Sequence, residues 1–390
     1  MSIEQLALDP ERQQKAREYG KLLRRLLSLE LGIGAVLLLA LLLTGASHWL
    51  VDFLPFASPW SAALYLLTLV FGYGILMAPL SCYRDFVLAR HYGLSTQDMA
   101  GWVKDKAKTL ALGLLLGLCI AVVIYWLMSY LPTLWWLVAS LVVFLLSLFL
   151  TCLTPTVLIP LFFKLRPLED GELKDRLAKL CKRAGVDIKN VLTINLSSKA
   201  TTANAMLGGW GKSRRVIISD TLLQGYSSDE IEVTLAHELG HHLHHDIPKL
   251  IAIQAVAFLL VFYLANLALK VGAVLYSFQG TDDVAGFPWL ILVLATITIV
   301  LQPLLNWRKR GIELAADKAA LELSSNPHGF VSLITKLTDQ NLADAEPSRW
   351  TKVLFYDHPT YNERVRLAHD YDCHCSELWL REQRRRGEAI

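Results

Sequence analysis

Six long apolar runs constrain this chain of 390 residues more than any other feature of its sequence. They lie near residues 27–46, 58–82, 109–131, 135–160, 248–276 and 287–306. A helix needs about 20 apolar residues to cross the hydrocarbon core, where every backbone polar group must be bonded internally. Only 19% of the residues are charged, against roughly a quarter in a soluble domain. The sequence therefore predicts a mainly α, polytopic membrane protein with six transmembrane helices.

Lysine and arginine are distributed unevenly over the loops between these runs. They are concentrated before the first run, between the second and third, and after the fourth and sixth. The loops at the opposite ends of the spans contain none, and Lys270 near the end of the fifth run is the one exception. By the positive-inside rule, both termini and the large polar segments are predicted to be cytoplasmic.

Residues 164–246 are polar enough to form a compact portion outside the membrane. Leucines at helical spacing predict a helix over 171–185. Strand-like runs at 191–196, around 203–207 and at 214–219 predict a small sheet, with a turn at 208–211. Ser227 and Glu230 form a capping box that opens a helix running to about residue 245, after which Asp246 is the expected N-cap of the fifth span.

The segment HELGH occupies residues 237–241, inside this predicted helix. His237 and His241 are four residues apart, so both imidazoles project from one helix face and can bind one metal ion. Glu238 can reach a metal-bound water without binding the metal itself. The alternative is a solvated helix face rich in histidine, because further histidines lie at 242, 244 and 245. The motif and its capped helix favour a zinc site, with one Zn²⁺ per chain.

Catalytic zinc takes a third protein ligand and keeps one position open. The extended motif with a third histidine is absent, because His244 occupies its glycine position and Ile247 its last position. Glu313 is the best remaining candidate, since the sixth span delivers it to the membrane surface where the fifth span begins. Asp317, one turn further along, can accept a hydrogen bond from a ligand histidine. A solvated acidic helix face is the alternative for these two residues.

Several segments together resemble the integral-membrane gluzincin peptidases of the CAAX prenyl protease 1 type. They are HELGH, ELAAD at 313–317, the Asn204–Ala205 pair followed by 208–223, and DHPTYNERV at 357–365. Residues 82–108 and 160–177 are also similar to that family. The resemblance implies zinc, Glu313 as its third ligand, and a water-filled chamber enclosed by the transmembrane helices. It further implies a bacterial homologue, in the inner membrane, with a cytoplasmic-side gluzincin catalytic domain containing a small β-sheet.

With these motifs placed, the chain divides into four parts. An N-terminal membrane domain with four spans covers residues 1–163. The first part of the zinc peptidase domain, with the HELGH helix, covers 164–246. A transmembrane hairpin of two spans follows at 247–307. The second part of the peptidase domain and a C-terminal tail occupy 308–390.

The expected activity is that of a zinc metalloendopeptidase, a hydrolase. Zinc lowers the pKa of a bound water, and Glu238 takes its proton as general base and returns it to the leaving amine. His358 and Arg364 are the predicted supports of the tetrahedral intermediate, with a helix cap and a structural ion pair as the alternative. The substrate is expected to lie extended beside the strand of Asn204 and Ala205, adding a strand to the sheet.

The chain departs from the eukaryotic members of the family in ways that leave its substrate open. Those members have one additional N-terminal span, and here Met206 and Thr360 replace their usual aromatic residue and proline. The expected partners are a peptide or protein, prenylated or membrane-inserted, and the lipid bilayer. The net charge of +3 is too small to indicate nucleic acid. A quality-control protease acting on unprenylated, damaged membrane proteins is the alternative; a receptor or scaffold with a relic metal site is disfavoured by the complete set of site residues.

Overall fold

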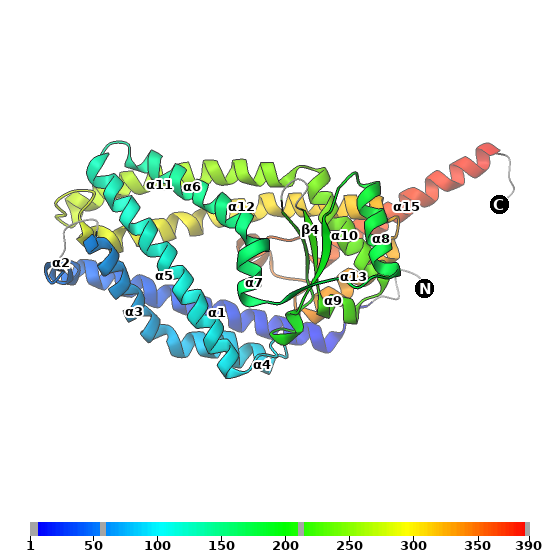
Figure 1. Ribbon diagram of the computed structural model, residues 1–390, viewed down its shortest axis with the longest axis horizontal. Helices are drawn as coiled ribbons and strands as arrows, with labels where there is room; N and C mark the ends of the chain where they lie inside the picture. Colours follow the sequence, from blue (N-terminus) through cyan, green and yellow to red (C-terminus); the bar gives the residue numbers. More distant parts are fainter. Residues whose placement is uncertain (1–6, 55–59, 210–213, 387–390) are drawn as a thin grey trace.

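The computed structural model describes residues 7–54, 60–209 and 214–386, and gives only the backbone for 375–386. Long helices run side by side over one half of an elongated molecule, and a small sheet with its helices forms the other half (Figure 1). Six helices in the described ranges are long and apolar enough to cross a membrane, which confirms the number of spans. They are Pro10–Leu43 (α1), Trp60–His91, Met99–Tyr130 (α5), Trp135–Phe162, Asp246–Leu275 (α11) and Val284–Ser324.

Two of these spans contain a π-helical segment near the peptidase half. The second consists of α3 (Trp60–Cys82), η2 (Tyr83–Leu88) and α4 (Ala89–His91), and the fourth of α6 (Trp135–Leu153), η3 (Thr154–Leu158) and α7 (Ile159–Phe162). Pro79 lies one turn before η2, and Pro155 lies inside η3. Proline lacks the backbone N–H that a regular helix needs, which accounts for a change of helical pitch at these two places.

Polar side chains inside the membrane half are bonded to one another. The Trp135 ring donates from Nε1 to Oδ1 of Asn266 at 2.9 Å, and both residues are buried. The Ser47 hydroxyl, on the short helix α2 (Ala46–Asp52), donates to the carbonyl of Ala285 at 2.6 Å and lies 2.8 Å from the Tyr65 hydroxyl. Ala285 belongs to η6 (Val284–Gly286). These bonds satisfy polar groups that would be costly in hydrocarbon.

A four-stranded sheet in the order β1–β2–β4–β3 supports the peptidase half. Its strands are Leu165–Pro167 (β1), Asn190–Ile194 (β2), Ala205–Gly208 (β3) and Arg215–Ser219 (β4), with η4 at Leu196–Ser198. β2 and β4 are parallel, whereas the two outer strands pair antiparallel. Three strands match the predicted runs closely, but β1 has too few residues to show an alternating pattern. β3 is an edge strand, and no strand within the described ranges pairs with its other side.

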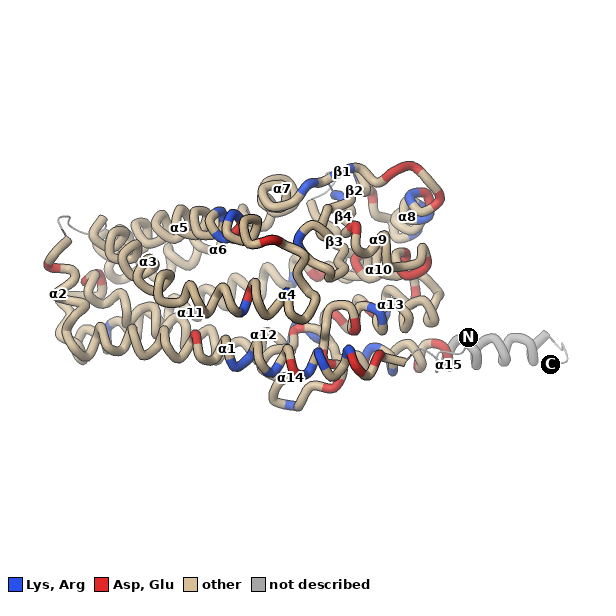
Figure 2. Tube along the Cα trace, turned by 90° about the horizontal axis from the view of Figure 1, so that it is seen from below, with Lys and Arg blue, Asp and Glu red and all other residues tan. Residues whose placement is uncertain are grey.

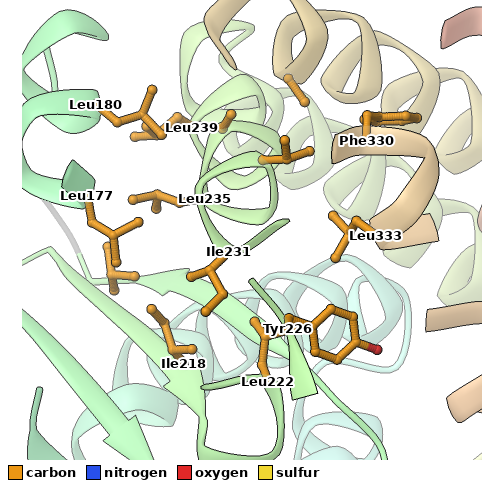
Figure 3. Close-up of a cluster of buried hydrophobic side chains, with 14 of the residues drawn as sticks. Leu177, Leu180, Ile218, Leu222, Tyr226, Ile231, Leu235, Leu239, Phe330 and Leu333 are labelled. Atoms are coloured by element: carbon orange, nitrogen blue, oxygen red, sulfur yellow. The ribbon is translucent and has the colours of Figure 1, made fainter. Parts of the chain in front are cut away.

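The core of this half surrounds α10 (Ser228–Leu243), as Figure 3 shows. Around it lie α8 (Glu172–Arg183), α9 (Asp220–Gly225) and α13 (Pro327–Gln340). Fully burying one such side chain contributes about 1.5–3 kcal/mol. The buried contacts come from Leu177 and Leu180 of α8, Ile218 of β4, Leu222 of α9, Ile231, Leu235 and Leu239 of α10, and Phe330 and Leu333 of α13.

One helix connects the two halves. α12 (Phe287–Ser324) continues from the sixth span into the peptidase core without interruption, so the predicted boundary between residues 307 and 308 falls inside it. α14 (Arg349–Phe355) packs against α12, and α15 (Tyr361–Arg386) follows. α1 begins, and α15 ends, on the same side of the molecule as the peptidase half (Figure 1).

Candidate metal centre

The predicted capping box at the start of α10 is present. The carboxylate of Glu230 accepts from the backbone N–H of Ser227 at 2.8 Å, and the Ser227 hydroxyl accepts from the N–H of Glu230 at 3.3 Å. Glu230 also accepts from Ser332 and Lys336 on α13, at 2.5 and 2.8 Å. The first turn of the helix that carries HELGH is therefore fixed to its neighbour as well as capped.

Gly240 of HELGH lies where α10 crosses α12. A Cβ added there would lie 2.9 Å from both the carbonyl oxygen of Ala316 and the Cβ of Ala319, too close for any side chain. Glycine on one helix and alanines on the other thus let the two backbones approach closely. This contact brings Glu313 and Asp317 of α12 beside the two histidines of α10.

The structure brings the three predicted metal ligands together. The Nε2 atoms of His237 and His241 lie 3.3 and 3.6 Å from the two carboxylate oxygens of Glu313. One ligand atom from each residue falls within 4.8 Å of the others. Oε2 of Glu313 is buried and makes no hydrogen bond of normal geometry with any described residue. Two imidazole nitrogens and one carboxylate oxygen are a donor set that catalytic zinc takes, so these residues fit the ion.

The other ring nitrogen of each histidine is held by a buried carboxylate. Nδ1 of His237 lies 2.9 Å from Asp317, whose two oxygens accept from Nε and Nη2 of Arg364 at 2.8 and 2.5 Å. Nδ1 of His241 lies 3.1 Å from Asp246. Such carboxylates orient a ligand imidazole and make its free nitrogen more basic.

Asp246 has a role at the site that differs from the one its local sequence predicts. It was expected to be the N-cap of the fifth span, but His245 occupies that position and α11 begins at Asp246. His245 has a φ of 52°, and the turn at this residue aims the Asp246 side chain back at His241. Lys249 then donates to the second oxygen of Asp246 at 3.1 Å. The available signal was an acidic residue five positions after His241, at the break between two helices.

Two groups of the HELGH segment have shifted pKa values. Burial opposes a charge on His237, but its contacts with the carboxylates of Asp317 and Glu313 prevail and raise its pKa to about 9. Burial raises the pKa of Glu238, although the nearby His237 and His241 partly oppose this. A carboxylate whose pKa is raised is a better proton acceptor, which suits a general base.

Glu238 lies between two cavities and beside the free side of β3. One cavity, of about 490 Å³, is lined by Asn204, Ala205 and Arg364, and the other, of about 300 Å³, by Leu207. Glu238, Asp357 and His358 line both cavities. The backbone N–H of Leu207 donates to Oε2 of Glu238 at 3.2 Å. β3 therefore passes from one cavity to the other beside the predicted base.

His358 and Arg364 are placed differently around the site. Nε2 of His358 lies 3.5 Å from Oε2 of Glu313, and its Nδ1 lies 2.8 Å from Asp357. The hydrogen bond to Asp357 is the main reason that the pKa of His358 is raised, and the same bond lowers the pKa of Asp357 to about 2. Arg364 contacts Asp317 behind His237 and also borders the larger cavity. The role of both residues toward an intermediate stays a prediction.

Comparison with known proteins places the chain in a family. A family model described as the CAAX prenyl protease N-terminal domain, with five membrane helices, matches residues 4–164, and one described as peptidase family M48 matches residues 167–371. Four of the membrane-competent helices in the described ranges lie within the first stretch.

Curated relatives come from plants, fungi, animals and bacteria. The CAAX prenyl protease 1 homolog of Oryza sativa subsp. japonica is 31% identical over 303 residues, covering 75% of this chain and 70% of the relative. An uncharacterized metalloprotease of Bacillus subtilis, YhfN, is 27% identical over 281 residues, covering 71% of this chain and 66% of the relative.

A solved structure shares the fold. The crystal structure of S. mikatae Ste24p superposes with a TM-score of 0.80, at 23% identity, over 93% of this chain and 89% of that one. The two family models together cover most of the chain. The chain belongs to the M48 metallopeptidases of the CAAX prenyl protease type.

Proposed function

We propose that this protein is a membrane-embedded zinc metalloendopeptidase whose general base is Glu238. One observation carries the proposal. Both Nε2 atoms of HELGH face the Glu313 carboxylate, while each Nδ1 is held by a separate buried carboxylate. This arrangement leaves three ligand atoms converging on one point, with Glu238 on the adjacent rim.

The residues around this point have distinct tasks. His237, His241 and Glu313 would hold Zn²⁺, which would supply a Lewis acid able to make water acidic near neutral pH and to polarise a peptide carbonyl. Glu238 takes a proton from the attacking water on its carboxylate and transfers it to the amine that leaves. His358, whose pKa is raised by Asp357, donates a hydrogen bond to the substrate oxygen as negative charge develops there.

The substrate is proposed to bind as an extra strand along β3. Asn204 accepts from the backbone N–H of Ser219 at 2.9 Å, so its backbone faces β4. Because bonding directions alternate along an antiparallel strand, the backbone groups of Ala205 and Leu207 face away from β4, toward the two cavities. At Gly208, Pro155 of η3 already occupies the space beside the strand, since a Cβ on Gly208 would lie 3.2 Å from the Cβ of Pro155.

The active site is proposed to face the cytoplasm, in the inner membrane of a bacterium. Charged residues gather around the peptidase half and at its boundary with the membrane half, whereas most of the bundle carries none (Figure 2). The start of α1 and the end of α15 lie on this charged side, as the positive-inside rule requires of cytoplasmic ends. Prenylated peptides or membrane-inserted segments would reach the site from the adjacent bilayer.

Cleavage by the purified protein tests this function. We would incubate it with a prenylated CAAX peptide, the same peptide without the prenyl group, and an unfolded membrane segment. Cleavage that stops with a chelator and returns with zinc is the expected result. Cleavage of the plain membrane segment alone would support the quality-control alternative, and cleavage that a chelator leaves unchanged would contradict the zinc mechanism.

A further inference from the structure

α14 presents an apolar face that no other part of the described chain covers. Trp350 is 74% exposed, and Leu354, one turn later on the same face, is also exposed, as is Phe355. On the neighbouring α12, Trp307 is 59% exposed beside the exposed Leu304. Contiguous exposed apolar groups of this kind mark an interaction surface.

The opposite side of α14 is firmly attached. Asn306 of α12 donates from Nδ2 to the carbonyl of Leu354 at 2.9 Å. Arg310 donates from Nη1 to the carbonyls of Lys352 and Tyr356 at 3.1 and 2.5 Å. These bonds satisfy the carbonyls that the end of a helix leaves unpaired. α14 is thus fixed in place with Trp350 and Leu354 directed outward.

The attachment point lies at the predicted membrane surface. Asn306 is the last residue of the sixth apolar run, and Arg310 lies one turn beyond it. In Figure 2, α14 lies outside α12 and α1, at the level along the molecule where α4 and α7 end the second and fourth spans. The apolar face of α14 therefore continues the lipid-facing surface of the bundle at its cytoplasmic edge.

Exposed cations lie on α14 itself, on α12, which packs against it, and on α1, which packs against α12. Arg349 of α14 and Arg308 of α12 are exposed, and the Arg308 guanidinium lies 5.7 Å from the centre of the Trp307 ring. Lys21 and Arg25 of α1 are exposed just before the first apolar run. Tryptophan and leucine on one face, with lysine and arginine around it, are typical of a helix that lies in the interface of an anionic bilayer.

We propose that α14 is an interfacial anchor, whose Trp350 and Leu354 lie at the boundary between headgroups and acyl chains of anionic lipid. α14 ends immediately before Tyr356, Asp357 and His358, which border the metal centre. An anchored α14 consequently holds this rim of the site at a constant height above the membrane. The anchoring itself requires only the membrane embedding, so it stands or falls separately from the peptidase mechanism.

Lipid contact can be measured with a fluorescent label. The native cysteines are replaced, buried Cys181 by alanine and the others by serine, and Trp350→Cys is introduced and labelled with an environment-sensitive dye. Leu145→Cys, on the exposed face of α6, is the lipid-facing control, and Lys179→Cys, on the exposed face of α8, is the water-facing control. Each variant is placed in nanodiscs with and without anionic lipid, with brominated lipid as quencher. An unchanged midpoint of thermal unfolding shows that the fold is retained.

The emission of the label at position 350 is expected to be blue-shifted, and brominated lipid should quench it nearly as strongly as it quenches the label at 145. Omitting anionic lipid, or adding Arg308→Glu and Arg349→Glu, should reduce that quenching severalfold. Behaviour like that of position 179 in every lipid mixture would overturn the proposal. A blue shift of the label at 350 that appears only when a peptide or a soluble protein is added would also overturn it, because α14 would then be a docking site for protein.

Discussion

The membrane half leaves most of its apolar surface exposed to lipid, whereas the peptidase half buries its apolar side chains in a core. In five of the six spans, only 6–17% of the most apolar window is buried inside the molecule, so lipid must cover the rest. The peptidase half buries its apolar residues in one continuous cluster around α10. The sixth span has 33% of its window buried, because its first residues, Val284, Phe287 and Leu290 among them, are buried in the membrane half. Its helix α12 then continues into the peptidase half and so belongs to both. The proposed metal centre is assembled on that shared helix, which makes it sensitive to packing in either half.

The largest expected effect tests whether α12 completes the site. Glu313→Ala removes one of three ligands, and we expect zinc affinity to fall by more than about 100-fold. That is more than the affinity lost when a residue that only hydrogen-bonds a ligand is replaced. The zinc content of the purified protein, determined by metal analysis, measures this loss of affinity. Glu322→Ala, an exposed carboxylate further along α12, is the matched control and should retain the metal. Full zinc occupancy in Glu313→Ala would show that α12 contributes no ligand.

The next prediction compares the two halves directly. Leu235→Ala opens a cavity in the core around α10 and should cost about 3 kcal/mol of unfolding free energy. Leu145→Ala, on the outer face of α6, should cost less than about 0.5 kcal/mol, because lipid chains fill the space. Thermal unfolding in nanodiscs compares the two variants. Equal losses would contradict the difference in how the halves are packed.

The pH dependence of zinc binding concerns the peptidase half alone. His237 has its pKa raised to about 9 in the metal-free fold, so its proton stabilises that state at low pH, and this contribution is lost as the pH rises through about 9. Zinc needs the neutral ring, so apparent affinity should increase about tenfold per pH unit from pH 7 to 9. Competition with a fluorescent chelator measures it. A flat profile would contradict the raised pKa.

The smallest expected effect separates the two carboxylates behind the histidines. Asp317→Asn and Asp246→Asn should each weaken zinc binding by about 10-fold or more. Asp317 is fully buried and held by Arg364, whereas the Lys249 partner of Asp246 is half exposed, so we expect the larger loss at Asp317. Titration with zinc compares them. A larger loss at Asp246 would reverse this order.

Local patterns predicted much of the molecule. The spans follow from hydropathy, the start of α10 from Ser227 and Glu230, and the pairing of His237 with His241 from helical spacing. The position of Glu313 near the histidines follows from topology, because the fifth and sixth spans form a hairpin that returns the chain to the same membrane surface. Each of these predictions depends only on residues close together in the sequence or on the side of the membrane at which a span ends.

Features that depend on a single turn or a distant contact were not predictable in this way. The role of Asp246 depends on the left-handed turn at His245. β1 is defined by its pairing with β2, and α14 by its bonds to Asn306 and Arg310. The need for Gly240 appears only when α12 lies against it. These contacts join segments whose spatial relation no local pattern contains.

The measurement that tests the central claim most directly compares Glu238→Gln with the unaltered protein. Zinc content and cleavage rate are measured on the same preparation, with one peptide that the unaltered protein cleaves. We predict full zinc occupancy with the rate reduced by at least about 100-fold, because the ligands remain and the base is lost. Cleavage at an undiminished rate with zinc in place would contradict the role assigned to Glu238.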